Sequence, residues 1–264
     1  MAEYQVALRQ RENSPEALLR LAHGYAHLDR LDECSKYYSR LLAMDSSYAD
    51  QAIADYLAIA QKALERNDRA GMARALEQLE AVKPGGVPAE LALPFARYYY
   101  ELSEYAHALP YYQAVVASDP DAIEPIVRYE LARVYYELGE CPRALLNYEF
   151  YLENRPRGER RSESIWHAGQ CAYRLAQADR EEGRTEIALD RFERVIELGA
   201  PQTLQDDAWF ERGEVLFGLG RFDEALQSYE KVLELNPSRT GRRVRQAEER
   251  IREIRYGGGT EEGG

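Results

Sequence analysis

A spaced pattern of aromatic, small and turn-forming residues recurs along this chain and limits its fold more than any other feature. The clearest copy consists of Trp209, Gly213, Leu216, Leu219, Gly220, Phe222, Ala225, Tyr229, Val232 and Pro237. Weaker copies precede it, and Pro84, Pro120 and Pro156 follow one another at intervals of 36 residues. A period of about 34 residues is typical of helix–turn–helix repeats, which bury a continuous core by stacking on one another.

Six repeats align, and the spacing of their apolar residues predicts helix almost everywhere and no strand. The repeats start near Pro15, Ile53, Ala89, Pro125, Ser162 and Asp206. We therefore predict an all-α fold, a right-handed α-solenoid of helix–turn–helix repeats that ends in a C-terminal capping helix. The fifth repeat carries an insertion at 176–184. We interpret it as longer helices rather than a longer loop, because its residues favour helix.

The repeats also predict the order of the segments. It comprises an N-terminal partial helix or cap (1–14), repeats 1 and 2 (15–86), repeats 3 to 6 (89–239), a capping helix (240–256) and a flexible tail (257–264). The proline- and glycine-rich stretch at 83–88 is a candidate hinge between the first two repeats and the last four. The capping helix carries one apolar stripe, Val244, Ala247, Ile251 and Ile254. Such a stripe is typical of a helix that covers the last repeat and turns a polar face to water.

The charge and hydropathy of the chain argue against two classes of partner. The sequence contains 34 Lys and Arg against 46 Asp and Glu, a formal net charge of −12. Nonspecific nucleic-acid binding needs an excess of positive charge, so we predict no nucleic-acid partner. No apolar run approaches the roughly 18 residues of a membrane span, so we predict no membrane insertion. The first residues lack the apolar core of a signal peptide, which predicts a cytoplasmic protein, or a periplasmic one if a leader has been removed.

No group of residues in the sequence points to catalysis, a cofactor or a metal. Cys34, Cys141 and Cys171 are odd in number and form no C-x-x-C pair, which predicts free thiols that pack as small residues. His23 and His27 share one predicted helical face, but no Cys, Asp or Glu cluster completes a metal shell. The common nucleotide-binding and hydrolase motifs do not occur. We therefore predict no catalytic residues, no cofactor, no metal and no enzymatic activity.

At its sixth repeat the chain resembles the tetratricopeptide repeat family. The resemblance is carried by Trp209, Gly213, Gly220, Ala225, Tyr229 and Pro237. The sequence departs from the family at Arg212 and Leu216, where the family prefers Leu and Tyr. The resemblance covers about residues 15–255, and the spacing looks like that of bacterial, envelope-associated members. It implies a general protein-interaction scaffold, whose ligand the fold does not specify.

In arrays of this family the first helix of each pair lines the concave face, which implies a ladder of inward-facing aromatic residues with charged and amide residues beside it. The predicted partner-binding residues are Arg97, Tyr100, Tyr129, Arg133, Tyr136, Trp166, Gln170, Tyr173, Phe210 and Phe217. Aromatic residues and Arg dominate binding hot spots, and such a groove suits an extended or helical peptide. A second interpretation is that many of these aromatics only fill gaps between neighbouring first helices.

The predicted function is a non-catalytic protein–protein interaction scaffold or adaptor that binds a peptide or a partner helix in an aromatic-rich concave groove. The alternative is a structural assembly module, which self-associates or docks into an envelope-associated complex through its ends or convex face. A third possibility is an auxiliary domain of an enzyme system. Family members that clamp a C-terminal carboxylate use Lys and Asn at inward positions. Those positions hold Leu, aromatic, Gln or Arg residues here, which disfavours that ligand.

Overall fold

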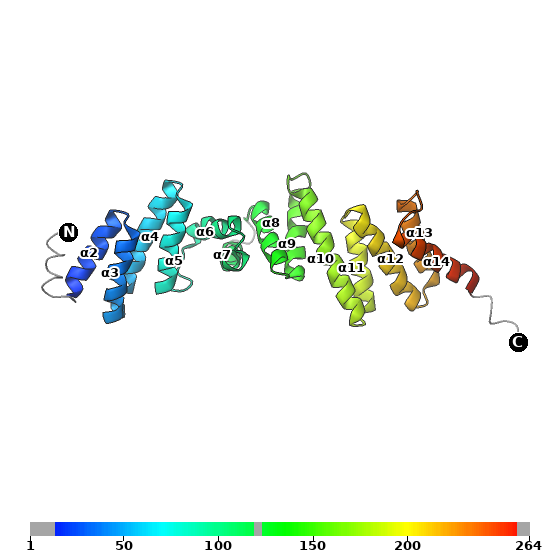
Figure 1. Cartoon of the computed structure of the whole chain (residues 1–264), viewed down its shortest axis with the longest axis horizontal. Coiled ribbons are helices and arrows are strands. Elements are labelled where there is room, and N and C mark those ends of the chain that lie inside the picture. The colour runs from blue at the N-terminus through cyan, green and yellow to red at the C-terminus, as the bar shows by residue number, and fades with distance from the viewer. Residues whose placement is uncertain (1–13, 119–122, 258–264) are drawn as a thin grey trace. The chain divides into compact units, whose positions relative to one another are not determined.

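The computed structural model describes residues 14–118 and 123–257, and within these ranges it contains thirteen α-helices, one short 3-10 helix and no strand. The predicted all-α solenoid class is confirmed. The chain divides into two compact units, residues 1–121 and 122–264. Figure 1 shows the helices in chain order. The predicted cap at 1–14 and tail at 257–264 lie almost wholly outside the described residues. No described helix combines the length and apolar character that crossing a bilayer requires.

The first unit contains three helix pairs. They are α2 (Pro15–His27) with α3 (Leu31–Met44), α4 (Ala49–Glu65) with α5 (Arg69–Val82), and α6 (Ala89–Glu101) with α7 (Tyr105–Ser118). A 3-10 turn, η1 (Ser46–Tyr48), joins α3 to α4. Ser14 starts the described chain, because its Oγ accepts a hydrogen bond from the Ala17 backbone N–H and Pro15 follows at the first helical position. The proposed hinge segment, 83–88, lies within this unit, between α5 and α6.

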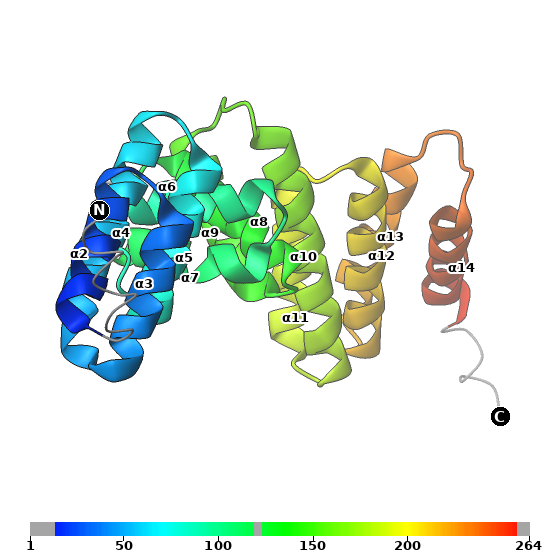
Figure 2. The ribbon, with the colours of Figure 1, turned by 60° about the vertical axis from the view of Figure 1, so that its left-hand side comes forward.

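The second unit contains three more pairs and a final helix. They are α8 (Pro125–Glu137) with α9 (Cys141–Asn154), α10 (Arg161–Glu181) with α11 (Thr185–Glu197), α12 (Gln202–Gly218) with α13 (Phe222–Leu235), and then α14 (Arg242–Tyr256). With 21 residues α10 is the longest described helix, so the insertion in the fifth repeat lengthens its first helix. In Figure 2, α14 lies beside α12 and α13, and it buries Val244, Ala247 and Ile251 against them.

The helices pair closely because each second helix places a small residue where the two helices cross and a large one a turn later. The small residues are Cys34, Ala108, Ala144, Ala188 and Ala225, all fully buried. The large ones, four positions on in each case, are Tyr38, Tyr112, Tyr148, Phe192 and Tyr229, also fully buried. This is the repeated core of the fold, and side chains three or four apart on a helix share the face that makes it. The second repeat fills the same places with Met72 and Leu76.

The turn inside each pair needs one residue in the left-handed conformation. In the second unit this residue is always glycine: Gly139, Gly183 and Gly220, with φ between 73° and 78°. In the first unit it is Asp29, Asn67 or Ser103, with φ between 56° and 61°. Glycine adopts this conformation without a steric penalty, whereas other residues are strained there. The three turns without glycine explain why the repeat is harder to recognise in the first half of the sequence.

Candidate binding surface

The ten residues predicted to bind a partner are divided between the two units. Arg97 and Tyr100 lie on α6 in the first unit. Both are half-buried, and the Tyr100 ring packs edge-on against the rings of Tyr105 and Tyr112. The other eight lie on α8, α10 and α12, which are first helices of pairs in the second unit. They can therefore be considered as one surface, which we call the first-helix face.

The most exposed part of the first-helix face is a stripe along α10. Trp166, Gln170 and Tyr173 are four and three residues apart, so they point to the same side of the helix. The Trp166 side chain is 38% exposed, and Gln170 and Tyr173 are half-buried. Tyr173 is held in place: its hydroxyl accepts a hydrogen bond from Gln177 Nε2 at 3.3 Å, and its ring packs edge-on against Phe192. This stripe presents an indole, an amide and a phenol to solvent.

Arg133 on α8 is bound to neighbouring side chains of the protein itself. Its Nε donates to Glu137 Oε1 at 2.8 Å, and one of its terminal nitrogens donates to Glu163 Oε1 at 2.7 Å and to His167 Nε2 at 3.1 Å. It therefore ties α8 to α10. His167 is buried, and both burial and the positive charge of Arg133 lower the pKa of its imidazole. The sequence suggested a guanidinium available to a ligand, but the structure places it inside an ion-pair network.

The remaining aromatics of the predicted ladder differ in depth. Tyr136 is half-buried, with its ring 4.2 Å from that of His167 and the Arg174 guanidinium 5.7 Å above it. Tyr129 is only 3% exposed and packs against the rings of Tyr148 and Tyr151. For Tyr129, therefore, the gap-filling interpretation describes the packing that the structure shows.

Phe210 and Phe217 on α12 are covered by two arginines of α14. The Arg243 guanidinium lies 4.6 Å from the centre of the Phe210 ring, and that of Arg250 lies 4.9 Å from the Phe217 ring. Phe210 is 5% exposed, and Phe217 is half-buried. The sequence analysis did not foresee this cover. The signal was present, because Arg243 and Arg250 are seven residues apart and so share one side of the helix next to its apolar stripe.

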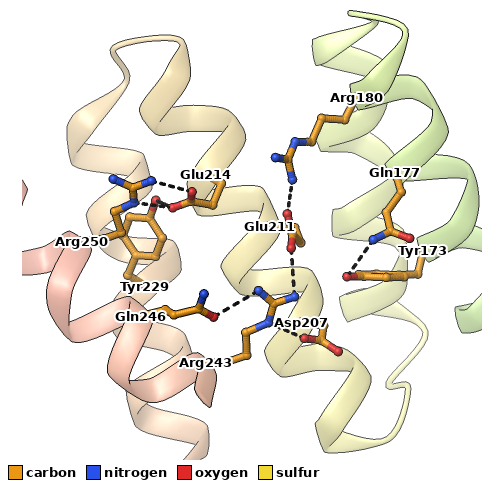
Figure 3. Close-up of polar contacts among 10 residues, drawn as sticks. All are labelled: Tyr173, Gln177, Arg180, Asp207, Glu211, Glu214, Tyr229, Arg243, Gln246 and Arg250. Carbon is orange, nitrogen blue, oxygen red and sulfur yellow. Dashed lines mark hydrogen bonds and ion pairs between the residues drawn. The ribbon is translucent and has the colours of Figure 1, made fainter. Parts of the chain in front are cut away.

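Both arginines are also paired with carboxylates of α12, as Figure 3 shows. Arg243 donates to Asp207 at 2.5 Å and to Glu211 at 2.9 Å, and Glu211 also pairs with Arg180 of α10. Glu211 is only 8% exposed, so this carboxylate bridges three helices in a largely desolvated place.

Glu214 is the second anchor of α14. Arg250 binds both of its carboxylate oxygens, at 2.8 and 2.9 Å, and the Tyr229 hydroxyl donates to it at 2.6 Å. Burial alone would raise the pKa of Glu214, but the hydrogen bonds from Arg250 and Tyr229 outweigh it and hold the pKa below its usual value. Bidentate arginine–carboxylate pairs fix orientation as well as charge, so α14 is held in one register on α12.

The described residues contain no group of three His, Cys, Asp or Glu side chains that could hold a metal ion. His23 and His27 do meet, with their Nε2 atoms 3.0 Å apart, while His23 Nδ1 lies 2.9 Å from Asp55. The same Asp55 accepts a hydrogen bond from Tyr38 at 2.6 Å. This arrangement satisfies the polar groups of the first repeats without a third ligand.

Two sequence models described as tetratricopeptide repeat match the chain, one at residues 93–158 and one at 206–239. The chain is a tetratricopeptide repeat protein. The matches fall on the third and fourth helix pairs and on the sixth, which is the pair that carried the resemblance in the sequence. Arrays of such repeats are scaffolds for protein–protein interaction, and the fold supports that general role here.

This tetratricopeptide repeat protein is similar to several solved structures. MamA is 18% identical, with 72% of this chain and 94% of MamA covered and a TM-score of 0.36. YrrB, described as a tetratricopeptide repeat protein with an unusual peptide-binding site, is 18% identical, with 74% and 91% covered and a TM-score of 0.37. The C-terminal part of a repeat protein from Cytophaga hutchinsonii is 18% identical, with 93% and 92% covered and a TM-score of 0.38. No curated protein matches the sequence.

Proposed function

We propose that this tetratricopeptide repeat protein is a non-catalytic adaptor that binds a peptide or a partner helix on the first-helix face of the second unit. The exposure of Trp166 is the observation that carries the proposal. In a fold whose other large aromatics are mostly buried or half-buried, an indole 38% exposed beside Gln170 and Tyr173 is an unusual use of surface. Trp and Tyr at the centre of a contact contribute most of the energy in many protein interfaces.

The charges around this stripe support a particular kind of contact. Arg133, Arg180 and Arg250 already form ion pairs within the protein, so a ligand would gain little by pairing with them. Recognition would depend on stacking against Trp166 and Tyr136 and on hydrogen bonds to Gln170, whose amide both donates and accepts. We therefore expect binding to change little between low and moderate salt, unlike binding that depends on exposed charges.

The test is affinity capture from the native host followed by measurement with the captured partner. Wild-type protein is compared with a Tyr136→Ala/Trp166→Ala variant and with Leu146→Ala. Leu146 is the matched control, because it is 67% exposed on α9, a second helix of the same unit. A partner bound by wild type and by Leu146→Ala but lost by the double variant supports the proposal. Equal binding by all three proteins refutes it.

A direct readout is available because the chain has only two tryptophans. Replacing Trp209 by Phe leaves Trp166 as the sole indole. Titration of the captured partner should then shift the Trp166 emission to shorter wavelength, because burial in the complex removes water from the ring. An unchanged emission at saturation would show that binding occurs elsewhere on the protein.

One feature favours the alternative, a structural assembly module. A hollow of about 670 Å³ lies between α13 and α14, with Leu233 and Ile251 in its lining beside charged residues of both signs. A helix of a second molecule could occupy it. Sedimentation velocity over a wide concentration range tests this: self-association that Leu233→Glu abolishes would favour assembly, and a concentration-independent monomer would remove this candidate.

A further inference from the structure

Cys141 and Cys171 meet in the second unit, although the sequence suggested only isolated packing thiols. Cys141 is the first residue of α9, and Cys171 lies midway along α10. The two helices pack against each other, and the two thiols are joined by a hydrogen bond. Both are reduced and buried in the structure. Sulfur atoms that already touch meet the first requirement for a disulfide, which is close approach of the two side chains.

Three groups around Cys141 favour its thiolate form. Cys171 donates a hydrogen bond to it, Arg174 lies beside it with a positive charge and a further hydrogen bond, and the N-terminus of α9 adds the positive end of a helix dipole. The hydrogen bond from Cys171 is the largest effect, and with Arg174 it lowers the pKa of Cys141 to about 6 against the opposing effect of burial. The pKa of Cys171 is raised by the same hydrogen bond and by burial. The pair therefore consists of one thiolate and one thiol.

Access distinguishes the two cysteines in the same way. Cys141 keeps 6% of its surface exposed, whereas Cys171 is completely buried. A small reagent reaches Cys141 first, and Cys171 then lies in position to react with whatever Cys141 has bound. A low-pKa thiolate next to a second thiol is the arrangement found in cysteines that respond to oxidants.

We propose that Cys141 and Cys171 form a thiol–disulfide exchange site that reacts with small disulfides, with Cys141 as the nucleophile and Cys171 as the resolving thiol. In the first step the Cys141 thiolate attacks a disulfide R–S–S–R, which forms a Cys141–S–S–R bond and releases one R–S⁻. In the second step Cys171 loses its proton and attacks the Cys141 sulfur, which forms the Cys141–Cys171 disulfide and releases the second R–S⁻. The protein is oxidised by two electrons, and the small disulfide is reduced to two thiols.

The chain contains its own control in Cys34. This cysteine is completely buried in the first unit, and its pKa is raised to about 12 by burial and by the charge of Asp55. It should therefore stay reduced under conditions in which Cys141 reacts. In urea all three cysteines become equivalent, so denatured protein provides the positive control for labelling.

The first experiment exposes the folded, full-length protein to oxidised glutathione near neutral pH and maps the products by non-reducing peptide mass spectrometry. We expect a disulfide-linked peptide pair containing Cys141 and Cys171, with Cys34 unmodified. In a Cys171→Ser variant the reaction should stop at glutathione attached to Cys141. Either of two results would overturn the proposal: Cys34 reacting as fast as Cys141, or no modification of Cys141 in wild type and in Cys171→Ser.

The second experiment measures the role of Cys171 through the pH dependence of alkylation at Cys141 by iodoacetamide. In wild type the rate should reach half its maximum near pH 6, where the thiolate forms. Cys171→Ser keeps a hydrogen-bond donor and should keep this midpoint. Cys171→Ala removes the donor and should move the midpoint up by about one pH unit or more, toward the ordinary value of about 8.5. A midpoint near 8.5 in wild type would refute the assigned roles without any dependence on a variant.

Discussion

Trp166 and Phe210 occupy equivalent places on successive first helices, yet their surroundings differ. Trp166 is 38% exposed, whereas Phe210 is 5% exposed beneath Arg243 and against Tyr229. We expect Trp166→Ala to lower the free energy of unfolding by about 1 kcal/mol or less, as for other exposed sites. Phe210→Ala should cost about 3–5 kcal/mol, because it leaves a cavity. Urea denaturation of both variants measures the difference, and equal losses would contradict the assignment of Trp166 to the surface.

His167 should make the stability of the protein depend on pH. Its Nε2 accepts a hydrogen bond from Arg133, so its proton lies on Nδ1, which has no partner in the structure. Burial and Arg133 lower its pKa below the ordinary value of 6.5, while Glu163 and Glu137 oppose this shift. The unfolded chain therefore binds a proton more readily than the folded one. The stabilising effect is present in full above about pH 6.5 and is lost as the pH falls toward the lower, folded-state pKa.

Measurement of this effect needs a variant without the titrating ring. Unfolding free energies between about pH 7.5 and pH 5.5 should fall more steeply for wild type than for His167→Gln. The amide keeps a polar group of similar size beside Arg133 but does not titrate. If the two proteins show the same slope over this range, other groups govern the pH dependence and the lowered pKa of His167 contributes nothing measurable.

At the scale of the helix pair, the left-handed turn residue is the feature most open to a controlled test. Gly220 has φ of 73° and Gly218, two residues earlier, ends α12. A Cβ added at either position meets no atom within 4 Å, so only the backbone decides the outcome. Gly220→Ala should lower stability by about 1–2 kcal/mol. Gly218→Ala should raise it by up to about 1 kcal/mol, because alanine favours helix. Thermal unfolding that shows the same sign for both would contradict this account.

The helices themselves could be predicted from the sequence, because burial repeats with the period of the fold. The pattern of Ala225 followed by Tyr229 recurs in every pair except the second, with cysteine for alanine in the first and phenylalanine for tyrosine in the fifth, and it fixes which face of each second helix is buried. The depth of the first-helix aromatics could not be predicted this way. Phe210 is buried because Arg243 of another helix lies on it, and Arg133 is engaged because Glu163 lies opposite. Such contacts depend on which residues meet between repeats, which periodicity within one repeat does not describe.

Over the whole molecule, the division into two compact units predicts where damage stops. Ala225 is fully buried at the crossing of α12 and α13, within a core that extends from α10 to α14. Ala225→Glu buries an unpaired charge there, which is strongly unfavourable. In a repeat array each unit is stabilised mainly by its neighbours. Hydrogen exchange should therefore accelerate across α12, α13 and α14 and stay unchanged in residues 14–118. Uniform acceleration along the chain would instead indicate a single cooperative unit.

The attachment of α14 has a consequence for modular engineering of this array. The helix is held by a match between its two arginines and three acidic residues of α12: Asp207, Glu211 and Glu214. The equivalent places on α10 hold Glu163, His167 and Gln170. Glu163 is already occupied by Arg133, and the other two offer no carboxylate. If the sixth repeat were excised, α14 would meet a surface that does not pair with it. The terminator of this array is thus keyed to one module, so the number of repeats is encoded in the last of them.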